Sequence, residues 1–379
     1  MALEFIPARP DDVAGLLTLY RQVYGRSYAL PLGTDPEVMA REITAPDTTW
    51  LVAREPGGDR LLGSILGTVD PAARIGKLQG LVIHPDARGL GGANLAVQQL
   101  ADQLLTGDHP VDSVYATART DTTAPQRICL KSGFRALGVL PNLRKAAWHE
   151  TMVLLAKHRA GVLEQRLPVH KVPSELGGLV RALADVPGPA QRPELVDEPL
   201  PRPRKGGSAV RELEFIDAPA FVSRRFDGLE ERFYPFHEPN VMLSAADGAY
   251  EVYAHLSPAD GYCTLIGIEL AESDEEIGEE LDTITDRLAA HGARYIEALV
   301  PLDSYHLLRR LLGHGFLPVA AYPAMRREGE GFRDHVVLAR VLQPLDFRGL
   351  AVDAAFQPFT EQYIELWKKQ HLDTHGIFQ

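Results

Sequence analysis

The chain has 379 residues, of which 45% are hydrophobic and 24% charged, so it is an ordinary globular sequence with room for two domains. Its net charge of −12 argues against nonspecific nucleic-acid binding and suits cationic or amine ligands, and its two cysteines exclude a disulfide framework. No apolar run approaches the ~18 residues of a membrane span, and the N-terminus lacks a signal-peptide pattern, so we expect a cytoplasmic protein without a membrane partner.

Residues 1–158 predict one α/β domain. In chain order, the patterns indicate a strand, two helices, three strands, a long helix, a strand, a short helix and two closing strands. The predicted ranges are Leu3–Ala8, Asp11–Tyr20, Asp35–Ile43, Thr49–Arg54, Arg60–Val69, Ile75–Ile83, Ala93–Leu104, Ser113–Thr120, Ala124–Ser132, Phe134–Val139 and His149–Leu155.

A glycine-rich turn, RGLGGA at Arg88–Ala93, follows the strand that ends at Ile83 and opens the helix Ala93–Leu104. This order aims backbone N–H groups and the positive end of a helix at one point, which favours a phosphate or pyrophosphate. Glycines there let a ligand approach the backbone closely. The spacing fits neither a dinucleotide-binding GxGxxG nor a Walker loop.

The pattern RxxGxA, read as Arg88, Gly91 and Ala93, resembles the acyl-coenzyme A site of the GNAT N-acetyltransferase superfamily. The order of the predicted elements in 1–158 also resembles that of the GNAT fold. The resemblance implies acetyl-coenzyme A or another acyl-coenzyme A as co-substrate, an amine acceptor and no metal. It also implies that the strand before the turn splays open to pair with the pantetheine arm. An ordinary β-to-α turn is the structural alternative. The implied coenzyme A-binding residues are Leu81, Val82, Ile83, Arg88, Gly89, Leu90, Gly91, Gly92, Ala93 and Asn94.

The segment Lys131–Phe134, KSGF, is a second similarity to the family, whose members often carry a tyrosine general acid where this chain has Cys129. A thiol with a pKa of ~8.5 can protonate a thiolate, so Cys129 is a candidate acid, and simple packing is the alternative. The strand before the turn has no carboxylate, which leaves His84 as the nearest candidate base, with a structural histidine as the alternative. The resemblance implies acceptor contacts from Tyr24, Arg26, Tyr28 and Arg119.

The rest of the chain predicts a linker at 159–208, with a helix at Ser174–Asp185 and a Pro-rich segment, and then a degenerate copy of the fold at 209–345. At the position of the glycine turn this copy reads AESDEE, Ala271–Glu276. Four carboxylates there would repel a pyrophosphate by roughly 1–4 kcal/mol each. The tail, 346–379, contains a predicted helix, Phe359–Lys368, that packs across the domains or onto a second subunit of a homodimer.

The sequence therefore predicts two GNAT-like, mixed but mainly antiparallel sheets flanked by helices and joined by a Pro-rich linker. The expected function is transfer of an acetyl or other short acyl group to a small-molecule or peptide amine by the N-terminal domain. The C-terminal copy would shape the acceptor site or mediate assembly. A non-catalytic acyl-coenzyme A binding or sensing protein is the alternative, favoured by the missing tyrosine and carboxylate.

Overall fold

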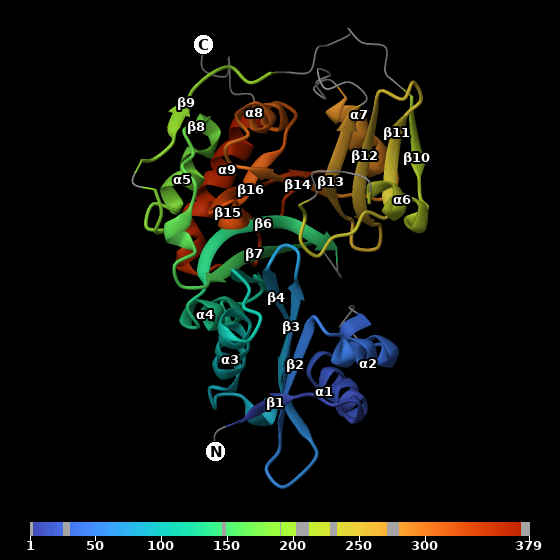
Figure 1. The fold of residues 1–379 in the computed structure, drawn as a ribbon, viewed down its shortest axis with the longest axis vertical. Coiled ribbons are helices and arrows are strands. Elements are labelled where there is room, and N and C mark those ends of the chain that lie inside the picture. Colours follow the sequence, from blue (N-terminus) through green and yellow to red (C-terminus); the bar gives the residue numbers. More distant parts are fainter. Residues whose placement is uncertain are drawn as a thin grey trace. The chain divides into compact units, whose positions relative to one another are not determined.

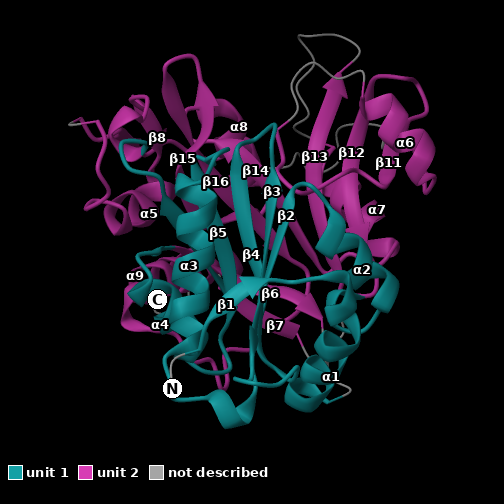
Figure 2. Ribbon diagram, turned by 60° about the horizontal axis from the view of Figure 1, so that its bottom comes forward, with its two compact units in different colours: residues 1–136, 153–162 teal, residues 137–152, 163–379 magenta. Residues whose placement is uncertain are grey.

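A computed structural model of the chain describes residues 3–25, 31–145, 149–189, 191–201, 212–227, 233–270 and 280–372. These residues divide into two compact units (Figure 2). Unit 1 contains residues 1–136 and 153–162, and unit 2 contains residues 137–152 and 163–379. Segment 137–152, which sequence order places in the first predicted domain, thus groups with unit 2. Among the described residues, no helix combines the length and the apolar character needed to cross a membrane.

Unit 1 is built on a sheet with the strand order β1-β2-β3-β4-β5-β7 (Figure 1). The pairs from β1 to β4 are antiparallel, whereas β4 and β5 are parallel. The strands are β1 (Phe5–Pro7), β2 (Thr48–Arg54), β3 (Leu61–Asp70), β4 (Ile75–Ile83), β5 (Ser113–Arg119) and the second half of β7 (His149–His158).

Helices cover both faces of this sheet. On one face, α1 and α2 form a core with Trp50 and Val82. On the other face lies α3, because a Cβ added at Gly76 would be 3.2 Å from Leu104 Cδ1, and α4 packs beside α3. The alternating residues of β4 therefore face two different helix layers. The helices are α1 (Val13–Tyr24), α2 (Pro36–Thr44), α3 (Gly92–Thr106) and α4 (Ala124–Lys131), with 3-10 turns η1 (Pro10–Asp12), η2 (Pro31–Gly33) and η3 (Pro85–Ala87).

Unit 2 has the strand order β6-β15-β16-β14-β13-β12-β11-β10, with the first half of β7 beside β6. The strands β10 to β14 lie next to one another in chain order, as β1 to β5 do in unit 1, and the fourth and fifth of them, β13 and β14, are again parallel. The strands are β6 (Arg135–Lys145), β10 (Leu213–Ile216), β11 (Val241–Ala245), β12 (Tyr250–Ser257), β13 (Tyr262–Leu270), β14 (Tyr295–Pro301), β15 (Leu317–Glu328) and β16 (Gly331–Val341).

Part of the predicted linker is folded within unit 2. It supplies η4, a two-stranded parallel sheet of β8 and β9, and η5 leading into α5, which packs on α9. The predicted acidic turn, Ala271–Glu276, lies outside the described residues. The remaining elements are η4 (Leu163–Gln165), β8 (Lys171–Pro173), η5 (Ser174–Leu176), α5 (Gly177–Ala182), β9 (Glu194–Val196), α6 (Pro219–Phe226), α7 (Leu281–Ala290), α8 (Tyr305–Gly313), η6 (Ala354–Phe356) and α9 (Gln357–His371).

The predicted fold class, mixed and mainly antiparallel sheet flanked by helices, is confirmed. The range of β4 agrees with the prediction at both ends. The strands β8, β9, β10 and β11 and the helix α6 were not predicted, because they are short and carry too few residues for a clear period.

Candidate functional site

Strand β4 contains a bulge. Between the pairs Ser64–Val82 and Leu66–Gln79, β4 has one residue more than β3. Gly80 lies in this stretch with φ +65°, a conformation that favours glycine. An extra residue reverses which face the following side chains point to, and Val82 accordingly joins the core under α1.

Two tyrosines of α1 hold this bulge. The Tyr20 hydroxyl donates to the Gly80 carbonyl at 2.7 Å, and the Tyr24 hydroxyl donates to the Leu81 carbonyl at 3.2 Å. A Cβ on Gly80 would lie 2.6 Å from the Tyr20 hydroxyl oxygen, so the contact requires glycine. Tyr24 is among the residues predicted from the sequence, whereas Tyr20 and Gly80 are not, although a glycine inside a strand often marks a bulge.

Strands β4 and β5 diverge beyond the bulge. They pair only over Ile75–Leu78 and Ser113–Ala116, although β4 continues to Ile83 and β5 to Arg119. The ladder with β5 thus stops before Leu81–Ile83, on the side of β4 that faces the opening. A strand edge of this kind accepts an extended ligand arm through backbone hydrogen bonds.

The glycine-rich turn leads from this opening into α3. Gly89 and Gly91 have φ +80° and +78°, and Gly91 is the N-cap of α3 without any side-chain cap. By contrast, Asp35 caps α2 through the Glu37 N–H at 2.8 Å. An uncapped helix start presents backbone N–H groups and a partial positive charge to an anion.

Three residues of the turn differ in their surroundings. A Cβ at Gly91 would meet nothing within 4 Å, whereas one at Gly92 would lie 2.4 Å from Leu3 Cδ1. Gly91 thus borders open space, and Gly92 is required for packing. In the first turn of α3, the Asn94 Oδ1 atom is buried and has no hydrogen-bond partner among the described residues, which leaves a polar atom for a ligand to satisfy.

Cys129 points inward from α4 and is 7% exposed. Burial raises the pKa of its thiol to about 12. The Phe134 N–H donates to the Cys129 carbonyl at 3.1 Å, and in unit 2 the Phe316 N–H donates to the Leu311 carbonyl at 3.0 Å in the same kind of turn. Leucine therefore occupies the matching position in unit 2, which is the expectation for a packing residue.

His84 ends β4 and is buried. Its Nδ1 accepts from the Asp86 N–H at 3.2 Å and caps η3. The Nη2 atom of Arg60 lies 3.0 Å from His84 Nε2 and 2.7 Å from Asp86 Oδ2. Both ring nitrogens thus have neighbours that stabilise the end of the strand.

Among the predicted acceptor residues, Tyr24 and Arg119 lie at the opening between β4 and β5. Burial raises the pKa of Tyr24. The charges of Arg119 and Arg88 lower this pKa and the charge of Asp121 raises it, so all three side chains are within electrostatic reach of the Tyr24 hydroxyl. Arg26 and Tyr28 lie outside the described residues.

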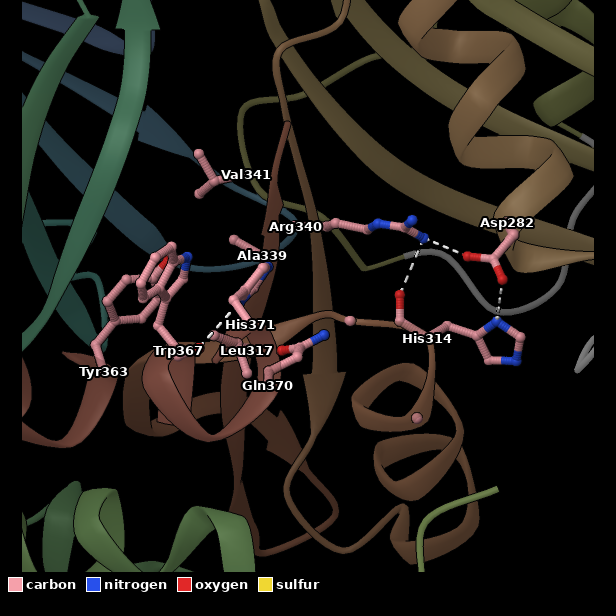
Figure 3. Close-up of a pocket in the computed structure, with 12 residues that line it drawn as sticks. Asp282, His314, Leu317, Ala339, Arg340, Val341, Tyr363, Trp367, Gln370 and His371 are labelled. Atoms are coloured by element: carbon pink, nitrogen blue, oxygen red, sulfur yellow. Dashed lines mark hydrogen bonds and ion pairs between the residues drawn. The ribbon is translucent and has the colours of Figure 1, made fainter. Parts of the chain in front are cut away.

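Unit 2 contains a cavity of about 300 Å³ beside the turn that follows α8 (Figure 3). In Figure 3, Arg340 of β16 reaches Asp282 of α7, and its Nη1 also donates to the His314 carbonyl at 3.0 Å. Trp367 and Tyr363 of α9 line the opposite wall.

The ion pair between Arg340 and Asp282 has a counterpart in unit 1. Lys157, the next-to-last residue of β7, binds Asp102 of α3 at 2.7 Å beside Gly133. Arg340, the next-to-last residue of β16, binds Asp282 of α7 beside Gly315. Gly133 and Gly315 both have φ +85°.

No protein-family model matches the chain, and no curated protein matches it. Similar solved structures include a GNAT-family acetyltransferase from Streptococcus pneumoniae, with 19% identity and a TM-score of 0.36 over 42% of this chain and 99% of that one. The spermidine N-acetyltransferase from Vibrio cholerae, solved with CoA and spermine, has 13% identity and a TM-score of 0.36 over 42% and 96%. The phosphinothricin acetyltransferase from Sinorhizobium meliloti, solved with AcCoA, has 15% identity and a TM-score of 0.37 over 42% and 89%.

Proposed function

We propose that unit 1 is a GNAT-type N-acyltransferase that moves a short acyl group from acyl-coenzyme A to an amine. One observation carries the proposal: the diverging β4 edge leads directly into an uncapped helix start behind two left-handed glycines. The β4 edge suits an extended arm that contains amides, and the start of α3 suits a pyrophosphate. Acyl-coenzyme A contains such an arm followed by a pyrophosphate.

In this proposal, the backbone from Leu81 to Ile83 pairs with the pantetheine arm, and the first turn of α3 binds the pyrophosphate together with Arg88. Acyl-coenzyme A supplies an activated thioester carbonyl. Backbone N–H groups near the bulge stabilise the charge that develops on the carbonyl oxygen. A neutral amine held beside the thioester attacks the carbonyl carbon chiefly because it is positioned there. The C–S bond then breaks, and the proton that the amine loses passes through water to the departing coenzyme A thiolate.

Isothermal calorimetry with coenzyme A and a free-thiol assay with acetyl-coenzyme A and a panel of amines test the proposal. We expect coenzyme A to bind and thiol release to depend on an amine. If coenzyme A did not bind, the assignment of Leu81–Ile83 and the first turn of α3 as its site would be wrong.

A non-catalytic acyl-coenzyme A binding protein is the second candidate. The buried thiol of Cys129, with its raised pKa, favours it, because the usual general-acid position then holds a poor acid. Binding of coenzyme A without amine-dependent thiol release would support this candidate over the enzyme.

We further propose that unit 2 is a degenerate copy of the same fold that does not bind coenzyme A. Its strand order, the limited parallel pairing of β13 and β14 and the matching ion pair beside Gly315 support the duplication. The acidic sequence at Ala271–Glu276 supports the loss of the pyrophosphate site. The cytoplasmic location, the acyl group and the homodimer remain predictions from the sequence.

A further inference from the structure

The cavity beside the turn that follows α8 is lined only by residues of unit 2, so it shares no element with the proposed coenzyme A site. Its volume of about 300 Å³ is in the range of sites for small molecules. Charged, amide and aromatic side chains line it together, whereas a packing defect is lined by apolar groups. The hydrogen-bonding groups in this lining indicate which ligand the cavity fits.

Arg340 of β16 presents one edge of its guanidinium to a ligand. Its Nη1 atom donates to Asp282 Oδ1 and, at 3.0 Å, to the His314 carbonyl, and these contacts fix the side chain (Figure 3). The Nε and Nη2 atoms share another edge, and neither has a hydrogen-bond partner among the residues that the structure describes. The side chain is 26% exposed. Two parallel N–H groups on a fixed fork suit two adjacent acceptor atoms of a planar ligand.

The charge of Arg340 argues against an anionic ligand on this edge. Arg340 and Asp282 form an ion pair at the cavity, and His314 Nδ1 lies 3.3 Å from the second carboxylate oxygen of Asp282. A carboxylate or phosphate on the Nε–Nη2 edge would also lie close to Asp282. Its repulsion by this carboxylate would offset its attraction to the guanidinium. A neutral ligand with two adjacent acceptors avoids the repulsion.

Trp367 of α9 supplies a flat wall. Its ring stacks on that of His371, with the centroids 4.7 Å apart and the planes at 15°, so the indole is held in one orientation (Figure 3). Gln370 Nε2 and Arg340 Nε would lie 2.7 and 3.6 Å from a Cβ added at Gly315, so the amide and the guanidinium edge meet over this glycine. A fixed aromatic ring stacks with a planar heterocycle, and an amide offers it both a donor and an acceptor.

We propose that this cavity binds a guanine-type purine base as a free nucleoside. The O6 and N7 atoms of guanine are two adjacent acceptors, and an arginine edge binds both. In adenine an amino group replaces O6 and would face the donors of Arg340. The base stacks on Trp367, and Gln370 supplies a further hydrogen bond. The inference is independent of the function proposed for unit 1.

Calorimetry of the full-length protein with guanosine tests the inference. Adenosine and 7-deazaguanosine, which lacks the N7 acceptor, are the matched ligands, and benzoate tests the anionic alternative. We expect guanosine to bind at least roughly tenfold more tightly than each of the three. Undetectable binding of guanosine overturns the inference, as does equal or tighter binding of adenosine, 7-deazaguanosine or benzoate.

Arg340→Lys is the most informative variant, because Lys157 occupies the counterpart position in unit 1 and pairs there with Asp102. The lysine keeps a positive charge opposite Asp282 but lacks the fork, so guanosine affinity should fall roughly 10- to 100-fold. Urea denaturation checks the fold. Wild-type affinity in folded Arg340→Lys overturns the inference.

A second variant tests the stacking wall. Trp367→Ala should weaken guanosine binding roughly tenfold, and Trp367→Phe should recover part of the loss. Lys369→Ala, at an exposed position of the same helix, is the control and should bind guanosine as wild type does. Gly91→Glu should also bind guanosine normally, because Gly91 belongs to unit 1. Unchanged affinity in Trp367→Ala overturns the inference even if Arg340→Lys does not fold.

Discussion

Gly91 and Gly92 are adjacent glycines with different physical roles. Gly92 is needed because a Cβ would strike Leu3, so its substitution damages packing. Gly91 borders open space with φ +78°, so its substitution chiefly alters what approaches the turn from outside. Gly91 is therefore the cleaner residue for testing the pyrophosphate assignment.

Gly91→Glu should weaken coenzyme A binding at least roughly tenfold, because its side chain blocks the backbone and brings a negative charge near the pyrophosphate. Calorimetry measures the effect, and circular dichroism checks the fold. Gly248→Glu is the matched control, since Gly248 in unit 2 has φ +74° and equally open surroundings. A Gly91→Glu protein that binds within about threefold of wild type would show that the pyrophosphate lies elsewhere.

Cys129→Ala should leave kcat nearly unchanged and cost about 1 kcal/mol of unfolding free energy. A thiol with a pKa of about 12 donates its proton unfavourably to a coenzyme A thiolate of pKa about 8.5, by roughly 5 kcal/mol. The thiol assay and urea denaturation give both quantities. Cys263→Ala, at the other buried cysteine, controls for the loss of a buried sulfur. A fall in kcat of roughly 10²-fold or more in folded protein would instead make Cys129 a general acid.

At the scale of elements, the functional geometry depends on how α1 meets β4. The bulge, two tyrosine hydroxyls and the divergence from β5 lie within a few residues of one another along β4. The bulge interrupts the ladder with β3, and two hydroxyls of α1 bind the carbonyls of Gly80 and Leu81. The position of the proposed thioester site is thus a property of two elements together.

Gly80→Ala should lower the unfolding free energy by about 1–3 kcal/mol and weaken coenzyme A binding. Alanine is strained at φ +65° and its Cβ would collide with the Tyr20 hydroxyl. Urea denaturation and calorimetry measure the two effects. Gly58→Ala, in an open hairpin turn, should change stability by no more than about 0.5 kcal/mol. Unchanged stability in Gly80→Ala would mean that the bulge does not need this glycine.

The β13–β14 pair of unit 2 carries a buried carboxylate, Glu297, which accepts hydrogen bonds from Tyr234, Tyr262 and Tyr295. Burial raises the pKa of Glu297, and the three hydroxyls offset this only in part. The folded state therefore holds the proton more tightly than the unfolded state. Its contribution to stability is largest below pH ~4.5 and falls as the pH rises above that value.

Glu297→Gln should remove this dependence. Between pH 4.5 and 7.5, the unfolding free energy of the wild type should fall relative to that of the variant, as urea denaturation at several pH values would measure. If the unfolding free energy of the wild type relative to that of Glu297→Gln stayed constant or rose with pH, the raised pKa of Glu297 would be contradicted.

For the whole molecule, the central expectation is an asymmetry between two similar units. The strand orders match, yet one turn is RGLGGA and the other AESDEE. Calorimetry on the full chain should therefore give one coenzyme A site per chain, and this site should be the one that Gly91→Glu weakens. Two equivalent sites would show that the acidic turn does not exclude the ligand.

The sequence by itself determined the fold class, the range of β4 and the placement of a glycine turn before α3. These follow from apolar periods and from Gly and Pro, which act on the neighbouring backbone. The sequence did not decide whether Cys129 is a general acid or only a packing residue, because a residue type carries no information about its burial.

Only the tertiary structure decided the rest. The Tyr20–Gly80 contact joins residues 60 positions apart, the pKa of Cys129 depends on what covers it, and Arg119 meets Tyr24 only after β5 and α1 are placed. Residues 163–201 looked like a linker because their elements are short, and they fold by packing within unit 2 rather than by local pattern. Burial, electrostatic neighbours and the partners of short elements arise from contacts between distant segments, which local sequence does not encode.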